Sequence, residues 1–309
     1  MSSRALATVC HIQLYIHDQT AKTHPEGNPL AIIRVPSTSK LTQNQKQAIA
    51  AEFNLSETVF LHLTSDDSNQ TTSRTIDIFT PNAELPFAGH PTIGTIFYLL
   101  KTGGEGSNSN IDTITTKAGP IPISLFGDNK VRAVIPQTFH RHAKTFTSKF
   151  TGDVGHPMCS IVKGMTFIYV QLPDLETLGK VDLQTGNVVG DTYASAETMD
   201  EGWKVGLVGT MYYVPVNTPG KGEQRHYRTR MIFTREDPGT GSASCGLAAY
   251  LAKEVVGGGE GRESFVFEQG VEMGRRNEIT VEVEIKGGEV EGVWLSGEAA
   301  VVMEGTVQV

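Results

Sequence analysis

Short runs in which apolar and polar residues alternate make up much of the chain. Helical periodicity is rarer, and its clearest instance lies at residues 41–53, where Thr42 and Gln45 fit a capping box and Ile49 and Phe53 are one turn apart. Many strands with few helices predict an α+β fold rather than a doubly wound sheet. The alternating runs predict strands at residues 11–17, 58–63, 75–80, 130–136, 165–172, 209–216, 228–234, 263–268, 278–286 and 290–296.

Two crowded turns, at residues 79–100 and 234–256, share one layout. Each carries a glutamate five residues before a glycine, Gly89 in the first turn and Gly241 in the second, and each leads into an apolar helix. A strand marked by a further glycine follows about 30 residues later in both cases. The pattern predicts two related halves, offset by about 152 residues and each wrapping strands around one apolar helix; chance similarity of glycine-rich turns is the alternative.

The first residues of these two helices are candidates for binding an anion. Pro91 favours a helix start, which predicts His90 as an N-cap, and Ser242 has the same place in the second turn. Free backbone N–H groups at a helix start attract anions, and Gly89 and Gly241 let a ligand approach them. If the halves face each other, both starts point into one cleft that suits a small carboxylic acid. The alternative is that His90 and Ser242 only cap helices.

Glu57 is a candidate general acid/base. In an extended strand it shares one face with Leu55, Val59 and Leu61, so its carboxyl is expected among apolar neighbours. Desolvation there would raise the pKa of the carboxyl and suit it to proton transfer. Two alternatives stay open: an edge strand with Glu57 in water, or a buried acid paired with a basic residue.

Composition narrows the classes of partner. The net charge of -8 and the 19% of charged residues argue against nucleic acid or an anionic membrane surface. Cys10, Cys159 and Cys245 lie far apart, which suggests a reducing compartment and no structural zinc. No run approaches the ~20 apolar residues of a membrane span, so a cytoplasmic protein is expected. His140 and His142 could hold a metal from one strand face, but a solvated strand end is favoured because no third ligand stands at ligand spacing.

The motifs described so far resemble those of the phenazine-biosynthesis-like (PhzF-like) family, whose relatives include diaminopimelate epimerase. The likeness runs along nearly the whole chain. The matching stretches are GNPLAII (27–33), LSETVFL (55–61), FTPNAELPFAGHPTIGT (79–95), EDPGTGSA (236–243) and QGVEMGR (269–275).

The resemblance implies two similar lobes, each a curled mixed β-sheet around a central helix. The first lobe is expected to span residues 1–120 with the tail 291–309, and the second to span 121–290. The resemblance also implies a homodimer and an isomerase that moves a hydrogen within a small carboxylic acid without a metal or organic cofactor.

The resemblance assigns roles to individual residues as well. Glu57 is expected to remove and return the proton, while His90, Asp237 and Ser242 position the substrate and relay protons. Substrate contacts are expected at Asn28 and at the two turn glycines, Gly89 and Gly241.

The sequence departs from its epimerase relatives, which carry two cysteines, one beside each helix start. The first such position looks like Ala88, and Cys245 falls close to the second, where inert packing is the favoured interpretation. The leading hypothesis is an isomerase acting in secondary metabolism. The alternatives are an epimerase or racemase that uses Cys245 with Glu57, and a non-catalytic small-molecule-binding protein of the same fold.

Overall fold

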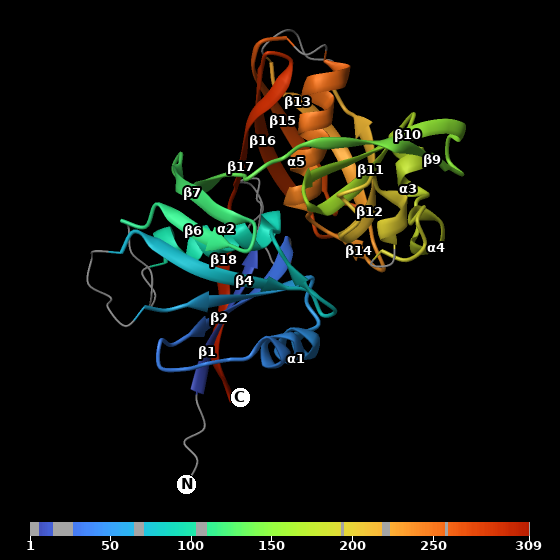
Figure 1. Cartoon of the computed structure of the whole chain (residues 1–309). Helices are drawn as coiled ribbons and strands as arrows, with labels where there is room; N and C mark the ends of the chain where they lie inside the picture. Colours follow the sequence, from blue (N-terminus) through green and yellow to red (C-terminus); the bar gives the residue numbers. More distant parts are fainter. Residues whose placement is uncertain are drawn as a thin grey trace. The chain divides into compact units, whose positions relative to one another are not determined.

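The computed structural model describes residues 6–14, 27–64, 71–102, 110–192, 195–217, 223–256 and 259–308. Contacts within the chain define two compact units (Figure 1). Unit 1 comprises Gly27–Val134 with the strands from both ends of the chain, and unit 2 comprises Ile135–Leu295. The lobe boundaries expected from the sequence stay a prediction. Residues 15–17 of the first predicted strand lie outside the described part.

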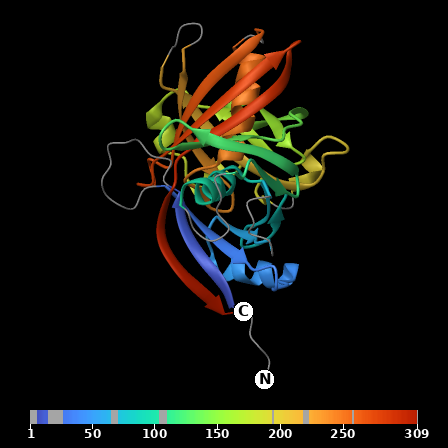
Figure 2. The same cartoon turned by 90° about the vertical axis from the view of Figure 1, so that its left-hand side faces the viewer.

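Unit 1 is a mixed sheet with two helices. Figure 2 shows its long β1 and β18, from opposite ends of the chain, running side by side as an antiparallel pair in register from Leu6↔Gln308. The elements of the unit are β1 (Leu6–Leu14), β2 (Asn28–Val35), α1 (Gln43–Phe53), β3 (Glu57–His62), β4 (Ser73–Phe79), β5 (Glu84–Leu85), α2 (Gly89–Lys101), β6 (Thr113–Thr116), β7 (Gly119–Phe126), β8 (Lys130–Val134) and β18 (Ala300–Gln308).

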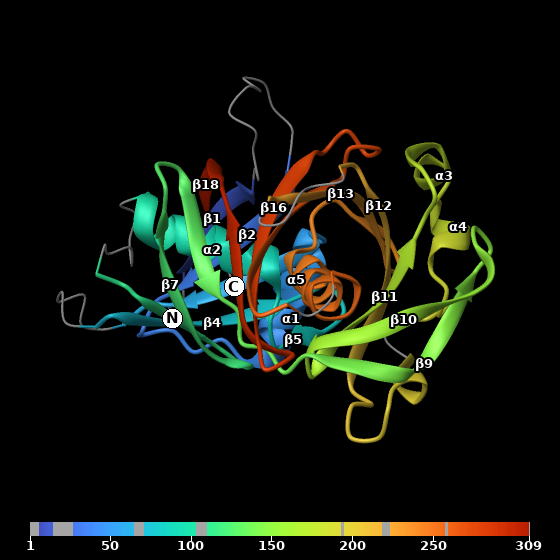
Figure 3. The ribbon, with the colours of Figure 1, turned by 90° about the horizontal axis from the view of Figure 1, so that it is seen from above.

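Unit 2 is a second mixed sheet that surrounds one main helix, α5, as Figure 3 shows. Its elements are β9 (His140–Ser148), β10 (Gly152–Val162), β11 (Gly164–Gln171), α3 (Leu175–Gly179), α4 (Leu183–Gly186), η1 (Ser195–Thr198), β12 (Gly206–Pro215), β13 (Arg225–Ile232), β14 (Glu236–Asp237), α5 (Gly241–Tyr250), the π-helical turn η2 (Leu251–Val255), β15 (Gly261–Gln269), β16 (Asn277–Lys286) and β17 (Glu289–Gly297).

The same order of strand pairings occurs in both units. In unit 1, β1–β2 is antiparallel, β2–β3 parallel, β3–β4 antiparallel, β4–β6 parallel and β6–β7 antiparallel. In unit 2, β10–β11, β11–β12, β12–β13, β13–β15 and β15–β16 repeat that series in order. The crowded turns also match, because each contains a two-residue strand, β5 or β14, just before the helix. The duplication predicted from the sequence is thus present as repeated topology, in a mixed α+β fold.

Both central helices are buried all round. Ten of the thirteen residues of α2 and nine of the ten residues of α5 are buried. A helix without a polar face is typical of a fully enclosed core element, and this composition explains why strands surround each one. Small side chains in α5 permit close approach: a Cβ at Gly246 would lie 2.2 Å from the hydroxyl oxygen of Tyr169.

Helix α1 lies outside this inner core and covers the opposite face of the unit 1 sheet. The predicted capping box is confirmed: the Thr42 N–H donates to Gln45 Oε1 at 2.9 Å, and the Gln45 N–H donates to Thr42 Oγ1 at 3.3 Å. Ala50 belongs to a buried cluster that also contains Phe60, and the partly buried Ile49 and Phe53 pack against this cluster. None of the helices in the described part of the chain is long and apolar enough to cross a membrane.

Candidate active site

Glu57 is the first residue of a central strand. Its strand, β3, pairs with β2 in the register Leu30↔Glu57 and with β4 on the other side. The Glu57 side chain is 14% exposed, so the alternative of an edge strand with Glu57 in water is wrong. Both faces of β3 are covered, since Phe60 faces the cluster under α1 while α2 packs on the sheet as well. The apolar alternation read from the sequence therefore does not by itself single out one face.

His90 lies in the first turn of α2, and its ring contacts the Glu57 carboxyl. Its Nδ1 is 3.3 Å from Glu57 Oε2 and 3.3 Å from Asn28 Nδ2. Burial lowers the pKa of His90 to about 3, although a hydrogen bond with the backbone of Pro29 acts in the opposite direction. The imidazole is therefore neutral at pH 7, and its contact with Glu57 is a carboxyl beside an uncharged ring rather than an ion pair.

A chain of polar contacts holds this pair in place. The Ser56 hydroxyl donates to Asn28 Oδ1 at 3.2 Å, and the amide of Asn28 faces His90. At the far side of the ring, His90 Nε2 is buried and has no hydrogen-bond partner among the described residues. A buried ring nitrogen in that position is one that a ligand oxygen can satisfy. Sequence reasoning missed Ser56, although it lies within the quoted LSETVFL motif.

The expected N-caps are corrected by the structure. Helix α2 begins at Gly89 after the N-cap Ala88, and α5 begins at Gly241 after the N-cap Thr240, with no side-chain capping bond in either helix. His90 and Ser242 are each the second residue of their helix. The glycines take the first helical position, and the His90 ring turns toward Asn28 and Glu57 instead of capping its own helix.

In unit 2 the matching turn is built on a hydrogen-bonded core. The Thr240 hydroxyl donates to Asp237 Oδ2, and Gln269 Nε2 donates to the backbone oxygen of Asp237 at 2.7 Å. The Thr240 N–H in turn donates to Gln269 Oε1 at 3.1 Å. Asp237 is 5% exposed and Ser242 is 2% exposed. The turn therefore presents two nearly buried polar side chains at a helix start.

Gly270 and Asn277 contact the backbone of the turn that contains Asp237. Gly270 has φ +77°, and a Cβ there would lie 2.2 Å from the Arg275 backbone oxygen and 2.6 Å from that of Pro238. Asn277 Nδ2 donates to the same Pro238 oxygen at 2.8 Å. The QGVEMGR stretch was matched to a family motif, but this positioning role was not predicted. The only feature of the local sequence that indicates it is Gly270.

The positions of the thiols distinguish this chain from a two-cysteine epimerase. By the repeat offset, the N-cap Ala88 matches the N-cap Thr240, so neither helix start carries a thiol. Cys245 lies further along α5, is completely buried, and has a thiol pKa raised by that burial. A thiol held protonated in an apolar helix is a poor base or nucleophile.

The interpretation of His140 and His142 as a solvated strand end is wrong for His142, which is 2% exposed. The absence of a third ligand along the sequence is also misleading, because Asp200, 58 residues from His142, folds back beside both rings. Local spacing cannot reveal a partner that a loop delivers from another part of the unit.

The predicted site residues thus form two groups, each within one unit. In unit 1, His90 contacts both Glu57 and Asn28, and Gly89 precedes His90 at the start of α2. The unit 2 group lies in one turn and the first positions of α5; it consists of Asp237, Gly241 and Ser242.

Comparison with known proteins agrees with this fold. The family model described as phenazine biosynthesis-like protein matches residues 19–305. An uncharacterized isomerase of Mesorhizobium japonicum is 28% identical over 90% of this chain and 93% of its own. The trans-2,3-dihydro-3-hydroxyanthranilate isomerase of Pseudomonas aeruginosa is 30% identical over 93% of this chain and 96% of its own. A crystal structure of a PhzF-family protein of Bacillus anthracis superposes with a TM-score of 0.70 at 21% identity, covering 99% of this chain and 100% of that one.

The chain therefore belongs to the phenazine biosynthesis-like (PhzF) family. Relatives that match nine tenths or more of its length are named isomerases, and the enzyme is an isomerase.

Proposed function

We propose that this enzyme is a cofactor-independent isomerase that moves a proton within a small carboxylic acid of secondary metabolism by general acid/base catalysis. Glu57 takes a proton from a carbon next to an activating group and returns it to another carbon of the same conjugated framework, so no atom is gained or lost. The proposal is carried by the 3.3 Å contact between Glu57 and His90, because it sets a largely buried carboxyl beside a neutral imidazole. Carboxyl and imidazole groups held in this way are the usual agents of proton transfer.

His90 supports the proton transfer in two ways. Its Nδ1 faces the carboxyl of Glu57, and its Nε2 has no hydrogen-bond partner among the described residues. A neutral imidazole accepts at one nitrogen and donates at the other, so the ring can hold a substrate oxygen while it fixes the orientation of Glu57. The surrounding burial restricts water, which keeps the proton from being lost to solvent.

The acid group of the substrate is proposed to bind at a helix start. Backbone N–H groups at the first positions of α2 and α5 have no partner within their own helix, and the helix dipole favours an anion there. Gly89 and Gly241 occupy these positions, so no side chain blocks the backbone. Asn28, Asp237 and Ser242 are proposed as the side chains that position the substrate and relay protons.

The thiol-based alternative has less support. It requires a reactive thiolate, and burial raises the pKa of the Cys245 thiol while Ala88 and Thr240 stand at the two helix starts. The homodimer implied by the family resemblance remains part of the proposal. Sedimentation velocity over a range of protein concentrations tests it, and a constant monomer mass contradicts it.

The proposed function is tested by running the isomerisation in D₂O and monitoring the reaction by NMR. The first compound to try is trans-2,3-dihydro-3-hydroxyanthranilate, named in the Pseudomonas aeruginosa relative, followed by a panel of small unsaturated acids. We expect one acid to be converted, with hydrogen or deuterium arriving at a single new carbon, and with equal rates before and after treatment with EDTA. Loss of turnover on chelation contradicts cofactor independence. Binding of an acid by calorimetry, without conversion or exchange of any panel member, indicates the non-catalytic alternative.

A further inference from the structure

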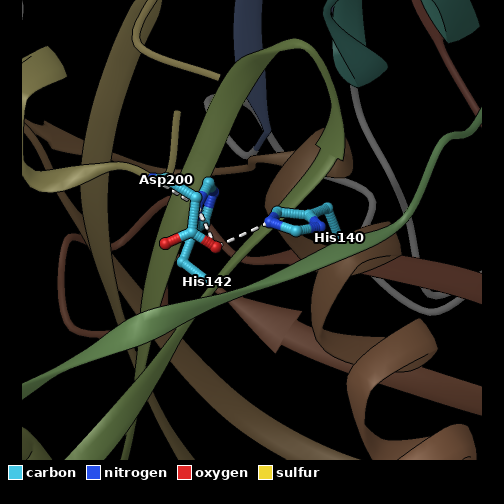
Figure 4. A group of neighbouring side chains, drawn as sticks. All are labelled: His140, His142 and Asp200. Atoms are coloured by element: carbon cyan, nitrogen blue, oxygen red, sulfur yellow. Dashed lines mark hydrogen bonds and ion pairs between the residues drawn. The ribbon is translucent and has the colours of Figure 1, made fainter. Parts of the chain in front are cut away.

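A cluster of two histidines and one aspartate lies in unit 2 and includes none of the residues proposed for the isomerase site. His140 and His142 stand two residues apart on β9, and Asp200 comes from the segment that follows η1 (Figure 4). One ligand atom from each of the three lies within 4.8 Å of the others. We propose that His140, His142 and Asp200 form a binding site for a divalent transition-metal ion of the zinc type.

The spacing of the donor atoms suits such an ion. His140 Nε2 is 2.9 Å from Asp200 Oδ2, and His142 Nδ1 is 3.7 Å from the same oxygen. Ligand atoms bound tetrahedrally at about 2.0–2.1 Å from zinc lie roughly 3.3 Å apart. The two observed distances bracket that value, so small side-chain rotations complete the geometry. His140 and Asp200 are each 32% exposed, so an ion can reach them from solvent.

Neighbouring side chains fix the positions of both rings. His142 Nε2 contacts Ser160 Oγ at 2.9 Å, and Ser160 in turn contacts Thr166 Oγ1 at 2.6 Å. Fixing the other nitrogen in this way leaves Nδ1 facing Asp200, as is usual for histidines that bind metals. His140 stacks on the Trp203 ring, with centroids 4.5 Å apart and planes within 7°.

Existing hydrogen bonds must give way when the ion enters. The Asp200 N–H donates to His142 Nδ1 at 3.1 Å, and the His140 ring contacts the Asp200 carboxylate. A cation replaces both contacts. The Ala143 N–H, 3.2 Å from each carboxylate oxygen, can still hold the side chain of Asp200. We therefore expect the ion to bind more weakly here than at a site without competing hydrogen bonds. The bound ion would link β9 to the segment after η1.

The test uses tag-free full-length protein, freed of metal with EDTA and then titrated with Zn²⁺ by calorimetry and with Co²⁺ by visible absorption. We expect one equivalent to bind, with the strong absorption of four-coordinate cobalt and a higher thermal unfolding temperature. His140→Ala and Asp200→Asn should weaken binding at least tenfold and remove the thermal shift. Both residues are partly exposed, and Asp200→Asn keeps an oxygen for the Ala143 N–H, so both variants should fold.

The matched control is His226→Ala, which removes a partly buried histidine of the same unit from outside the cluster. It should bind Zn²⁺ like the wild type. Equal affinity in the wild type and the His140→Ala variant, or no binding at millimolar Zn²⁺, would overturn the proposal and leave the cluster as a hydrogen-bonded clamp. Isomerase activity is not used as a readout, so this test and the test of the proposed function fail independently.

Discussion

The hydroxyl of Tyr169 on β11 reaches into α5, where it donates to the backbone oxygen of Ala243 at 3.0 Å beside Gly246. Tyr169 is completely buried, and its bond to Ala243 fixes how closely the helix approaches its sheet. The Tyr169 hydroxyl thus occupies the space that a Cβ at position 246 would need. The central helix of unit 2 consequently depends on a glycine for packing and not for backbone flexibility.

Gly246→Ala should destabilise the protein by about 1–3 kcal/mol, because the added methyl overlaps a bonded hydroxyl. Chemical denaturation measures the loss. Gly179→Ala is the matched control, since a Cβ there meets nothing within 4 Å, and it should cost nothing measurable. Adding Tyr169→Phe to Gly246→Ala should recover part of the loss; equal losses for the two glycine variants would show that the packing described here is wrong.

The stability of the protein should fall as the pH drops below about 6.5. The pKa of His90 is about 3 in the folded protein and near 6.5 in the unfolded chain, so between these values the unfolded chain binds the extra proton. This uptake lowers the free energy of unfolding by up to about 1.4 kcal/mol per pH unit for each such histidine. His142, with a pKa of about 4, acts in the same direction.

The contribution of His90 is isolated by comparing the wild type with His90→Gln in urea at several pH values. The variant should be less stable at pH 7 and should show a shallower decline between pH 6 and pH 4.5. Parallel curves in that range would mean that His90 carries the same charge in the folded and the unfolded chain, contrary to its burial.

The turn that carries Asp237 should depend on Gly270. Gly270→Ala places a methyl against two backbone oxygens that cannot move aside, whereas Gly274→Ala meets nothing within 4 Å at a similar φ of +67°. The control should lose about 1–2 kcal/mol from the left-handed backbone alone. Gly270→Ala should lose about 1–3 kcal/mol more from overpacking, together with substrate affinity. Similar losses of stability in the two variants would contradict the close approach of Gly270 to Pro238 and Arg275.

Cys245→Ser should leave turnover within a few-fold of the wild type, because the thiol is buried and protonated. The buried hydroxyl should reduce stability by about 1–3 kcal/mol if it finds no partner. Cys245→Ala is the companion variant that removes any nucleophile. A folded variant that loses turnover by several hundredfold would move the mechanism to the thiol-based alternative.

Much of the fold is predictable from local pattern. Ten alternating runs predicted strands, and each overlaps an observed strand within the described residues. The duplicated turns predicted the repeated topology, because glycine spacing before a helix is a local property that both halves retain. Strand β10 carries Pro157 and two glycines, and β9 is mostly polar, so neither shows clear alternation; both are strands because they pair with each other.

The candidate site was predictable in part. Glu57 and His90 could be selected from their motifs, but the 3.3 Å contact between them depends on how α2 packs on β3. The N-cap assignments failed because each helix begins two residues earlier than expected. The N-caps are Ala88 and Thr240 rather than His90 and Ser242, and a glycine takes the first helical position. Gln269 and Asn277 bond to residues 32 and 39 positions earlier in the chain, and no spacing pattern in the sequence predicts such contacts.

The most direct test of the proposed mechanism is the Glu57→Gln variant. Glutamine keeps the shape and hydrogen bonding of the side chain but cannot take a proton. Loss of a general base typically costs about 10²–10⁴-fold in rate. With the acid identified by the D₂O assay, we expect nearly unchanged binding, turnover reduced at least a hundredfold, and no exchange of substrate hydrogen with solvent. Turnover within a few-fold of the wild type would show that Glu57 is structural and that the proton is moved by another group.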